Sequence, residues 1–158
     1  MDVKTMTTTN EILSADQRAL LSAALNCIIP AQGEMPAAGD LDIGGFVESV
    51  AAGNAESRRR LLEGLVQIQL VAAEQGGDFQ ALPADAQMDA LRAVESSASE
   101  FFQYLVTQTY RGYYTNETVT SLLSYRAPNR QDYDPLPFDD SLLEPVRQRG
   151  QIWVPTNG

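Results

Sequence analysis

Five carboxylates near the C-terminal end form the densest group of side chains that could do chemistry. They are Asp132, Asp134, Asp139, Asp140 and Glu144. Oxygen-rich clusters can hold calcium, but the residue order does not match the D-x-[DN]-x-[DN]-G pattern of an EF-hand loop. A catalytic carboxylate pair needs two groups at a fixed distance on rigid elements, and prolines interrupt this stretch. Solvated charge is therefore the preferred interpretation, and contact with basic residues of a partner comes second.

The chain of 158 residues contains no histidine and a single cysteine, Cys27. Without an imidazole there is no Ser-His-Asp or Cys-His arrangement, no histidine general base and no His-ligated haem or zinc. One cysteine forms neither an intrachain disulfide nor a zinc or iron–sulfur site, and its apolar neighbours favour a buried structural thiol. Nucleotide-binding glycine motifs are also missing. We therefore predict no catalytic, cofactor-binding or metal-binding residues in this chain.

Acidic residues outnumber basic residues by 21 to 11, which gives a formal net charge of −10 at pH 7. This balance argues against nucleic acid and against anionic membrane surfaces, because both require a basic face. The opening residues MDVKTMTTTN lack the basic start and apolar core of a signal peptide, and no apolar run is long enough to span a bilayer. We expect a cytoplasmic protein, unless a partner carries it elsewhere or a leader has been removed.

The hydrophobic pattern divides the chain into three parts. Residues 1–12 are polar and are expected to be flexible, whereas residues 13–126 show apolar side chains at helical spacing. We predict that this central part forms a single all-α domain of five or six helices. Residues 127–158 contain five prolines, which preclude long regular elements and therefore predict an extended C-terminal arm.

Start and stop signals mark the individual helices. Ser14 followed by Gln17 fits a capping box, and Pro30 ends the helix that follows. Gly53 closes a short second helix, and Asn54 is a suitable N-cap for the third. The buried stripe of the third helix is predicted at Leu61, Leu65, Ile68 and Ala72. Later helices are predicted after Pro83, over residues 100–112 and after Asn116.

Aromatic side chains suggest where the chain contacts a partner. Tyr133, Phe138 and Trp153 lie in the C-terminal arm, and such residues are unusual in a solvated tail. They must be buried on the helices of the same chain or on another protein. Tyr113 and Tyr114 suit an interface and a half-buried domain edge equally well, because tyrosine is large and rigid with a polar tip. We predict that these five residues contribute to a partner interface.

Several longer segments follow one another in a characteristic order. The chain opens with LSADQRALLSAALNCIIP at residues 13–30, and GDLDIGGFVESVAAG and GGDFQALPADAQMDALRAVE follow. Next come an aromatic segment, FFQYLVTQTYRGYYTNE, and a closing stretch, LLEPVRQRGQIWVP. In their order and spacing these segments resemble the gluconate 2-dehydrogenase subunit 3 family, and the resemblance covers nearly the whole chain.

The resemblance implies a non-catalytic small subunit that binds and stabilises a larger flavin-dependent dehydrogenase of the glucose-methanol-choline type. In such a complex the large subunit carries FAD and oxidises a sugar or polyol, and some members have a third, haem-bearing subunit. Many members bear a twin-arginine signal that this sequence lacks, which favours a cytoplasmic complex. Two alternatives remain open. One is a stand-alone helical module with an internal apolar pocket for a small ligand, and the other is an enzyme that uses only carboxylates and tyrosines.

Overall fold

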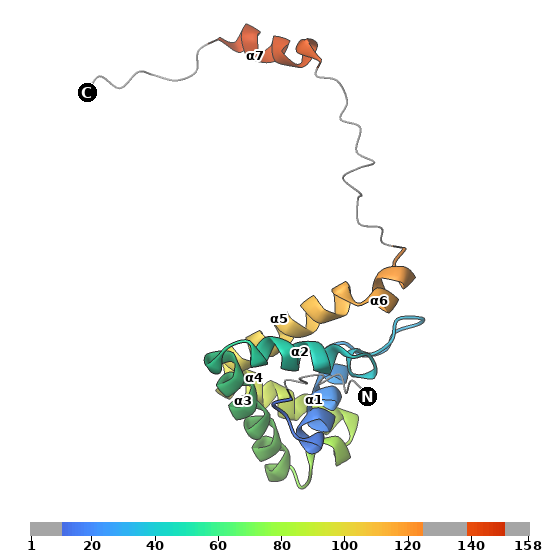
Figure 1. Ribbon diagram of the computed structural model, residues 1–158, viewed down its shortest axis with the longest axis vertical. Helices are drawn as coiled ribbons and strands as arrows, with labels where there is room; N and C mark the ends of the chain where they lie inside the picture. The colour runs from blue at the N-terminus through green and yellow to red at the C-terminus, as the bar shows by residue number, and fades with distance from the viewer. Residues whose placement is uncertain (1–10, 125–138, 151–158) are drawn as a thin grey trace, which may run out of the picture. The chain divides into compact units, whose positions relative to one another are not determined.

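The computed structural model describes residues 11–124 and 139–150, which belong to two compact units, Met1–Tyr125 and Arg126–Gly158 (Figure 1). The described part of the first unit contains α1 (Ala15–Ile28), α2 (Ile43–Ala52), α3 (Ala55–Glu74), α4 (Ala84–Ser97), α5 (Ser99–Thr115) and α6 (Glu117–Leu122). Two 3-10 turns, η1 (Ala38–Asp40) and η2 (Phe79–Ala81), lie between them. The described residues form no strand, which confirms the predicted all-α fold.

The second unit contains a 3-10 turn, η3 (Asp140–Leu143), and directly after it a short helix, α7 (Glu144–Arg149). This helix lies within the stretch that was predicted to be extended. Pro145 does not prevent it, because proline in the first turn lacks only an amide that would have no helical partner anyway. None of the helices in the described ranges is both long and apolar enough to cross a membrane.

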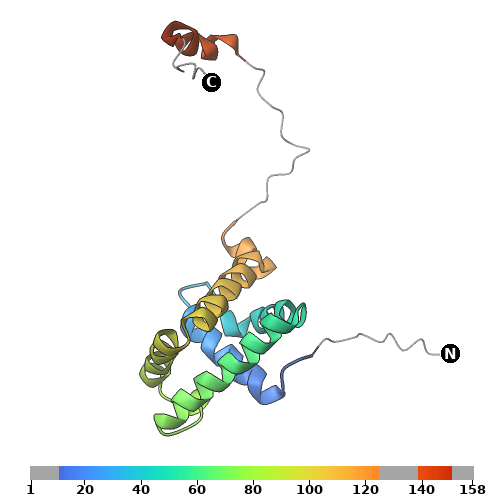
Figure 2. The same ribbon diagram turned by 90° about the vertical axis from the view of Figure 1, so that its left-hand side faces the viewer.

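The hydrophobic core of the first unit is built around α1, which contacts α2, α3, α4 and α5 (Figures 1 and 2). Leu21 and Leu25 of α1, four residues apart on one helix face, are fully buried. The stripe predicted on α3 is also confirmed, since all four of its residues, Leu61, Leu65, Ile68 and Ala72, are buried. Periodicity alone therefore identified the core-facing side of the longest helix.

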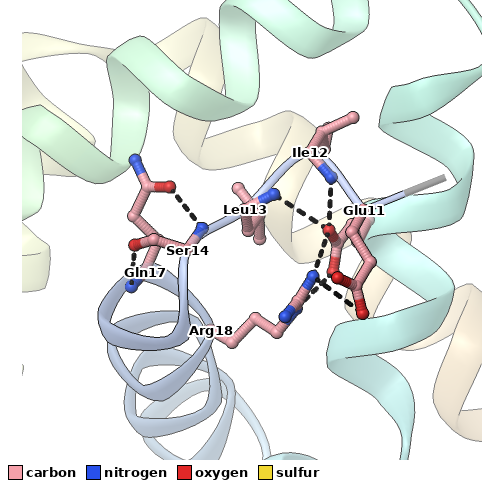
Figure 3. Close-up of polar contacts among 7 residues, drawn as sticks. Glu11, Ile12, Leu13, Ser14, Gln17 and Arg18 are labelled. Carbon is pink, nitrogen blue, oxygen red and sulfur yellow. Dashed lines mark hydrogen bonds and ion pairs between the residues drawn. The ribbon is translucent and has the colours of Figure 1, made fainter. Parts of the chain in front are cut away.

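Local signals set several helix starts as predicted, whereas α5 continues to Thr115, beyond the end predicted at residue 112. The Ser14 hydroxyl accepts a hydrogen bond from the Gln17 amide at 3.2 Å, and the Gln17 side chain accepts one from the Ser14 amide at 2.9 Å (Figure 3). The Asn54 side chain accepts from the Ser57 amide at 2.8 Å at the start of α3. Asn116 caps α6 in the same way. Each of these side chains satisfies an amide that the helix leaves without a partner.

Helices α3 and α5 approach closely because Gly64 has no side chain. A Cβ atom at this position would overlap the ring of Phe101, which is buried. We expect Gly64→Ala to lower the free energy of unfolding by about 2 kcal/mol, since overpacking outweighs the better helix propensity of alanine. Urea unfolding measures this change.

The matched control for that substitution is Gly77→Ala, because no atom lies within 4 Å of a Cβ at Gly77. The control should leave stability within about 0.5 kcal/mol of the wild-type value. Equal effects of the two substitutions would contradict close packing of α3 against α5 at Gly64.

Candidate partner-binding surface

Tyr113 and Tyr114, both predicted at an interface, lie in the last turn of α5 and have very different surroundings. Tyr113 is 2% exposed, and its hydroxyl donates a hydrogen bond to the carbonyl oxygen of Pro36 at 2.8 Å. Tyr114 is 52% exposed. Neighbouring residues differ by about 100° around a helix, so one tyrosine faces the core and the other faces solvent. Tyr113 is a packing residue, and only Tyr114 has a side chain available to a partner.

The other three predicted interface residues, Tyr133, Phe138 and Trp153, lie outside the described residues. Their contribution to an interface stays a prediction.

Exposed apolar side chains are found on α5 and on α6, which packs against α5. The ring of Tyr110 stacks on that of Tyr114, with centroids 6.0 Å apart and an interplanar angle of 13°. The rings of Tyr113 and Tyr114 meet edge to face, with centroids 5.3 Å apart and an interplanar angle of 87°. This contact holds Tyr114 against the buried ring of Tyr113. Leu122 and Leu123, at the end of α6, are 42% and 50% exposed. We refer to Tyr110, Tyr114, Leu122 and Leu123 as the α5–α6 face.

Charged residues are rare along these helices. Between Phe101 and Ser124 the sequence contains only Arg111 and Glu117 as charged residues. Aromatic enrichment together with depletion of charge is typical of the buried centre of a protein–protein interface. Tyr110 is not among the five predicted interface residues, although its spacing of four residues from Tyr114 places both on one helix face.

The buried acid Glu48 on α2 is a structural group rather than a general acid. Its carboxylate accepts hydrogen bonds from the amides of Ile12 and Leu13 at 2.7 and 2.9 Å. The guanidinium of Arg18 donates two more, at 2.9 and 3.1 Å (Figure 3). The hydrogen bond from Arg18, assisted by the two amides, lowers the pKa of Glu48 although burial opposes the shift. A general acid at neutral pH needs a raised pKa, so this site does not favour the carboxylate-enzyme alternative.

Cys27 is half-buried, and its thiol lies 3.5 Å from the side-chain oxygen of Gln87. Burial raises the pKa of the Cys27 thiol. A raised pKa reduces the thiolate fraction, which fits a structural thiol and not a nucleophile.

Of the C-terminal carboxylates within the described residues, Asp139 and Glu144 make local hydrogen bonds, Glu144 with the side chain of Gln148. Asp139 accepts a hydrogen bond from the Ser141 amide at 2.9 Å, and this bond lowers the pKa of Asp139. Asp132 and Asp134 lie outside the described residues. Nowhere in residues 11–124 and 139–150 do three or more acidic, histidine or cysteine side chains gather as metal ligands would.

Surface grooves of the first unit differ from the internal apolar pocket predicted for a stand-alone ligand-binding module. A groove of about 620 Å³ between α3 and the α4–α5 junction is lined by charged residues that include Glu56, Arg59 and Glu63. A second, of about 410 Å³, lies between α1 and α2 and includes Arg18 and Glu48. Both are open to solvent, so neither would bury a small apolar ligand as binding pockets do.

One comparison with known proteins gives a match. The model of a family described as gluconate 2-dehydrogenase subunit 3 matches residues 15–129. This range contains α1 to α6 and ends before η3 and α7. No curated protein and no solved structure matches the chain significantly.

Proposed function

Because the chain belongs to the gluconate 2-dehydrogenase subunit 3 family, whose model matches well over half of it, we propose that it is a non-catalytic small subunit. It binds and stabilises a separate catalytic subunit, which holds FAD and oxidises a sugar or polyol. The family description itself names a subunit of a dehydrogenase, which places the chain in a multisubunit enzyme.

The observation that carries the proposal is the α5–α6 face. Tyr110 and Tyr114 are rigid, stacked and about half exposed, and few charges lie near them in sequence. Tyr113 is anchored in the core beside them, so the face is ordered before binding. An ordered surface loses less conformational entropy on association than a mobile one. Burial of this face would contribute roughly 25 cal/mol per Å² of apolar area before the costs of association.

The amino-acid composition supports the proposal that the catalytic residues belong to the partner subunit. The sequence contains no histidine and one cysteine, whose raised pKa makes it a weak nucleophile. Dinucleotide cofactors such as FAD usually bind at the edge of a parallel sheet, and the described residues of this chain are helical. This supports our proposal that the catalytic subunit holds FAD, and we propose no reaction step for this chain.

Co-expression with a candidate flavoprotein dehydrogenase subunit tests the proposal. We expect the two chains to purify together in a fixed ratio, with flavin absorbance in the complex. The catalytic subunit expressed alone should be less soluble and should unfold at a lower temperature, because binding stabilises a folded protein in proportion to its occupancy. The two measurements are the absorbance spectrum and the melting temperature.

The same preparations also test the alternatives. A catalytic subunit that is equally stable without its partner, beside a small chain that stays a solitary monomer, would contradict the proposal. Turnover of any substrate by the isolated small chain would contradict its non-catalytic part.

A further inference from the structure

Helix α3 buries one apolar face in the core and exposes a second one. Val66 and Leu70 are 50% and 53% exposed, and the half-buried Leu62 precedes them at the same spacing of four residues. The exposed Ala73 continues this line toward the end of the helix. Side chains three and four residues apart form a ridge on a helix surface. We refer to Leu62, Val66, Leu70 and Ala73 as the α3 ridge.

A groove lies directly beside this ridge. It has a volume of about 430 Å³ and is bounded by residues of α1, α3 and η2. The buried Leu20 and Leu65 are among the residues that line it, together with Val66 of the ridge itself. Helices pack by placing the ridge of one into the groove of another. A surface that carries a ridge and an adjacent groove therefore has both parts of a contact with a copy of itself.

The two halves of α3 differ in charge. Residues 55–63 contain three arginines and two glutamates, whereas residues 64–78 contain only Glu74 and Asp78 as charged residues. The first half is therefore net positive, and the second half is net negative. Two copies of α3 that pack antiparallel bring opposite net charges together, whereas two parallel copies bring like charges together. The charge distribution favours an antiparallel pair.

We propose that α3 is a self-association surface, at which two copies of the chain pack antiparallel across a two-fold axis near the middle of the α3 ridge. In such a contact each copy presents the same patch, so the patch must be complementary to itself. The ridge, the groove and the charge distribution of α3 meet this requirement, which is why the occupant is a second copy. The contact uses none of the residues of the α5–α6 face. The inference therefore goes beyond the proposed function and does not depend on it.

Sedimentation equilibrium of the full-length chain over a range of concentrations is the first test. The average mass should rise from 17.2 kDa toward twice this value as the concentration increases. Val66→Ala combined with Leu70→Ala should raise the dissociation constant of the dimer at least about tenfold, because apolar burial is lost while alanine preserves the helix. The matched control is Tyr110→Ala combined with Tyr114→Ala on α5, which should leave this constant within about threefold of the wild-type value.

A charge swap tests the orientation of the two copies. Arg59 and Glu74 are 15 residues apart on α3, which is about 22 Å along the helix, so they do not pair within one copy. Arg59→Glu and Glu74→Arg should each weaken the dimer several-fold. Both substitutions in one chain should restore most of the affinity, because the new glutamate of one copy then faces the new arginine of the other.

Three results would overturn the proposal. The first is a wild-type chain that stays a 17.2 kDa monomer up to about 1 mM, which would leave the ridge to another protein or to another part of the chain. The second is a dimer that the substitutions at Val66 and Leu70 leave intact. The third is a dimer that the charge swap does not restore. Failure to bind a catalytic subunit would instead contradict the proposed function alone, because dimer formation is measured on the isolated chain.

Discussion

Replacing Glu48 with alanine should lower the free energy of unfolding by about 3 kcal/mol. The amides of Ile12 and Leu13 would each lose a charged acceptor, and such hydrogen bonds contribute about 1.5–3 kcal/mol before water replaces part of them. The loss falls directly before the capping box of α1, so the entry into the central helix is weakened. Urea unfolding at neutral pH measures the change.

A matched control is Glu63→Ala on α3. Glu63 is paired with Arg59 at 3.9 Å, and both side chains are about 70% exposed. Exposed pairs contribute little, so this substitution should change stability by less than about 1 kcal/mol. Similar losses of unfolding free energy for Glu48→Ala and Glu63→Ala would show that the buried Glu48 carboxylate stabilises the fold no more than an exposed carboxylate does.

The contribution of Glu48 to the free energy of unfolding should depend on pH. Arg18 and the two amides hold the pKa of Glu48 below its ordinary value, so the unfolded chain binds a proton there more readily than the folded chain. The stabilisation is therefore present above the ordinary glutamate pKa of about 4.3 and is lost as pH falls through the lowered pKa of the folded state.

Glu48→Gln isolates this dependence from that of the other carboxylates. The stability difference between wild type and Glu48→Gln should be largest near neutral pH and should shrink on acidification. A difference that stays constant from about pH 7 to about pH 3 would contradict the lowered pKa of this carboxylate.

Local features of this fold could be predicted from the sequence, because their causes lie within a few residues. The capping box of Ser14 and Gln17 and the cap at Asn54 each join residues three apart. Helical periodicity also predicted the buried stripe of α3, because one helix face packs against the core along its whole length.

Features that depend on contacts between distant segments could not be predicted. Glu48 meets the amide of Leu13 across 35 residues of sequence, and nothing near either residue indicates the pairing. Tyr113 and Tyr114 could not be told apart, because their difference depends on the orientation of α5 relative to Pro36, 77 residues from Tyr113.

The C-terminal region shows that proline can either interrupt a helix or occupy its first turn. The five prolines of residues 127–158 predicted an extended arm. Pro145 instead occupies the first turn of α7, where its fixed φ favours a helix start. The cap at Asp139 and the glycine after the helix are the signals that distinguish the two cases.

Removing both rings of the α5–α6 face, with Tyr110→Ala and Tyr114→Ala, should weaken binding to the catalytic subunit by more than about 100-fold. Tyrosines at the centre of an interface often contribute about 2 kcal/mol or more each, and tenfold in affinity corresponds to about 1.4 kcal/mol. Both side chains are about half exposed, so the folded small subunit should lose little stability. Affinity by calorimetry and stability by urea unfolding separate the two effects.

Helix α3 offers a matched pair for comparison. Val66 and Leu70 are 50% and 53% exposed and have the same i, i+4 spacing as the two tyrosines. Replacing both with alanine should leave affinity nearly unchanged, because this helix presents apolar side chains among charged ones and lacks the stacked rings. Strong weakening by the α3 pair with no effect of the tyrosine pair would move the docking surface from α5 to α3. Since the two pairs are alike in spacing and exposure, such a result would mean that exposed apolar area, and not an ordered aromatic pair, selects the partner.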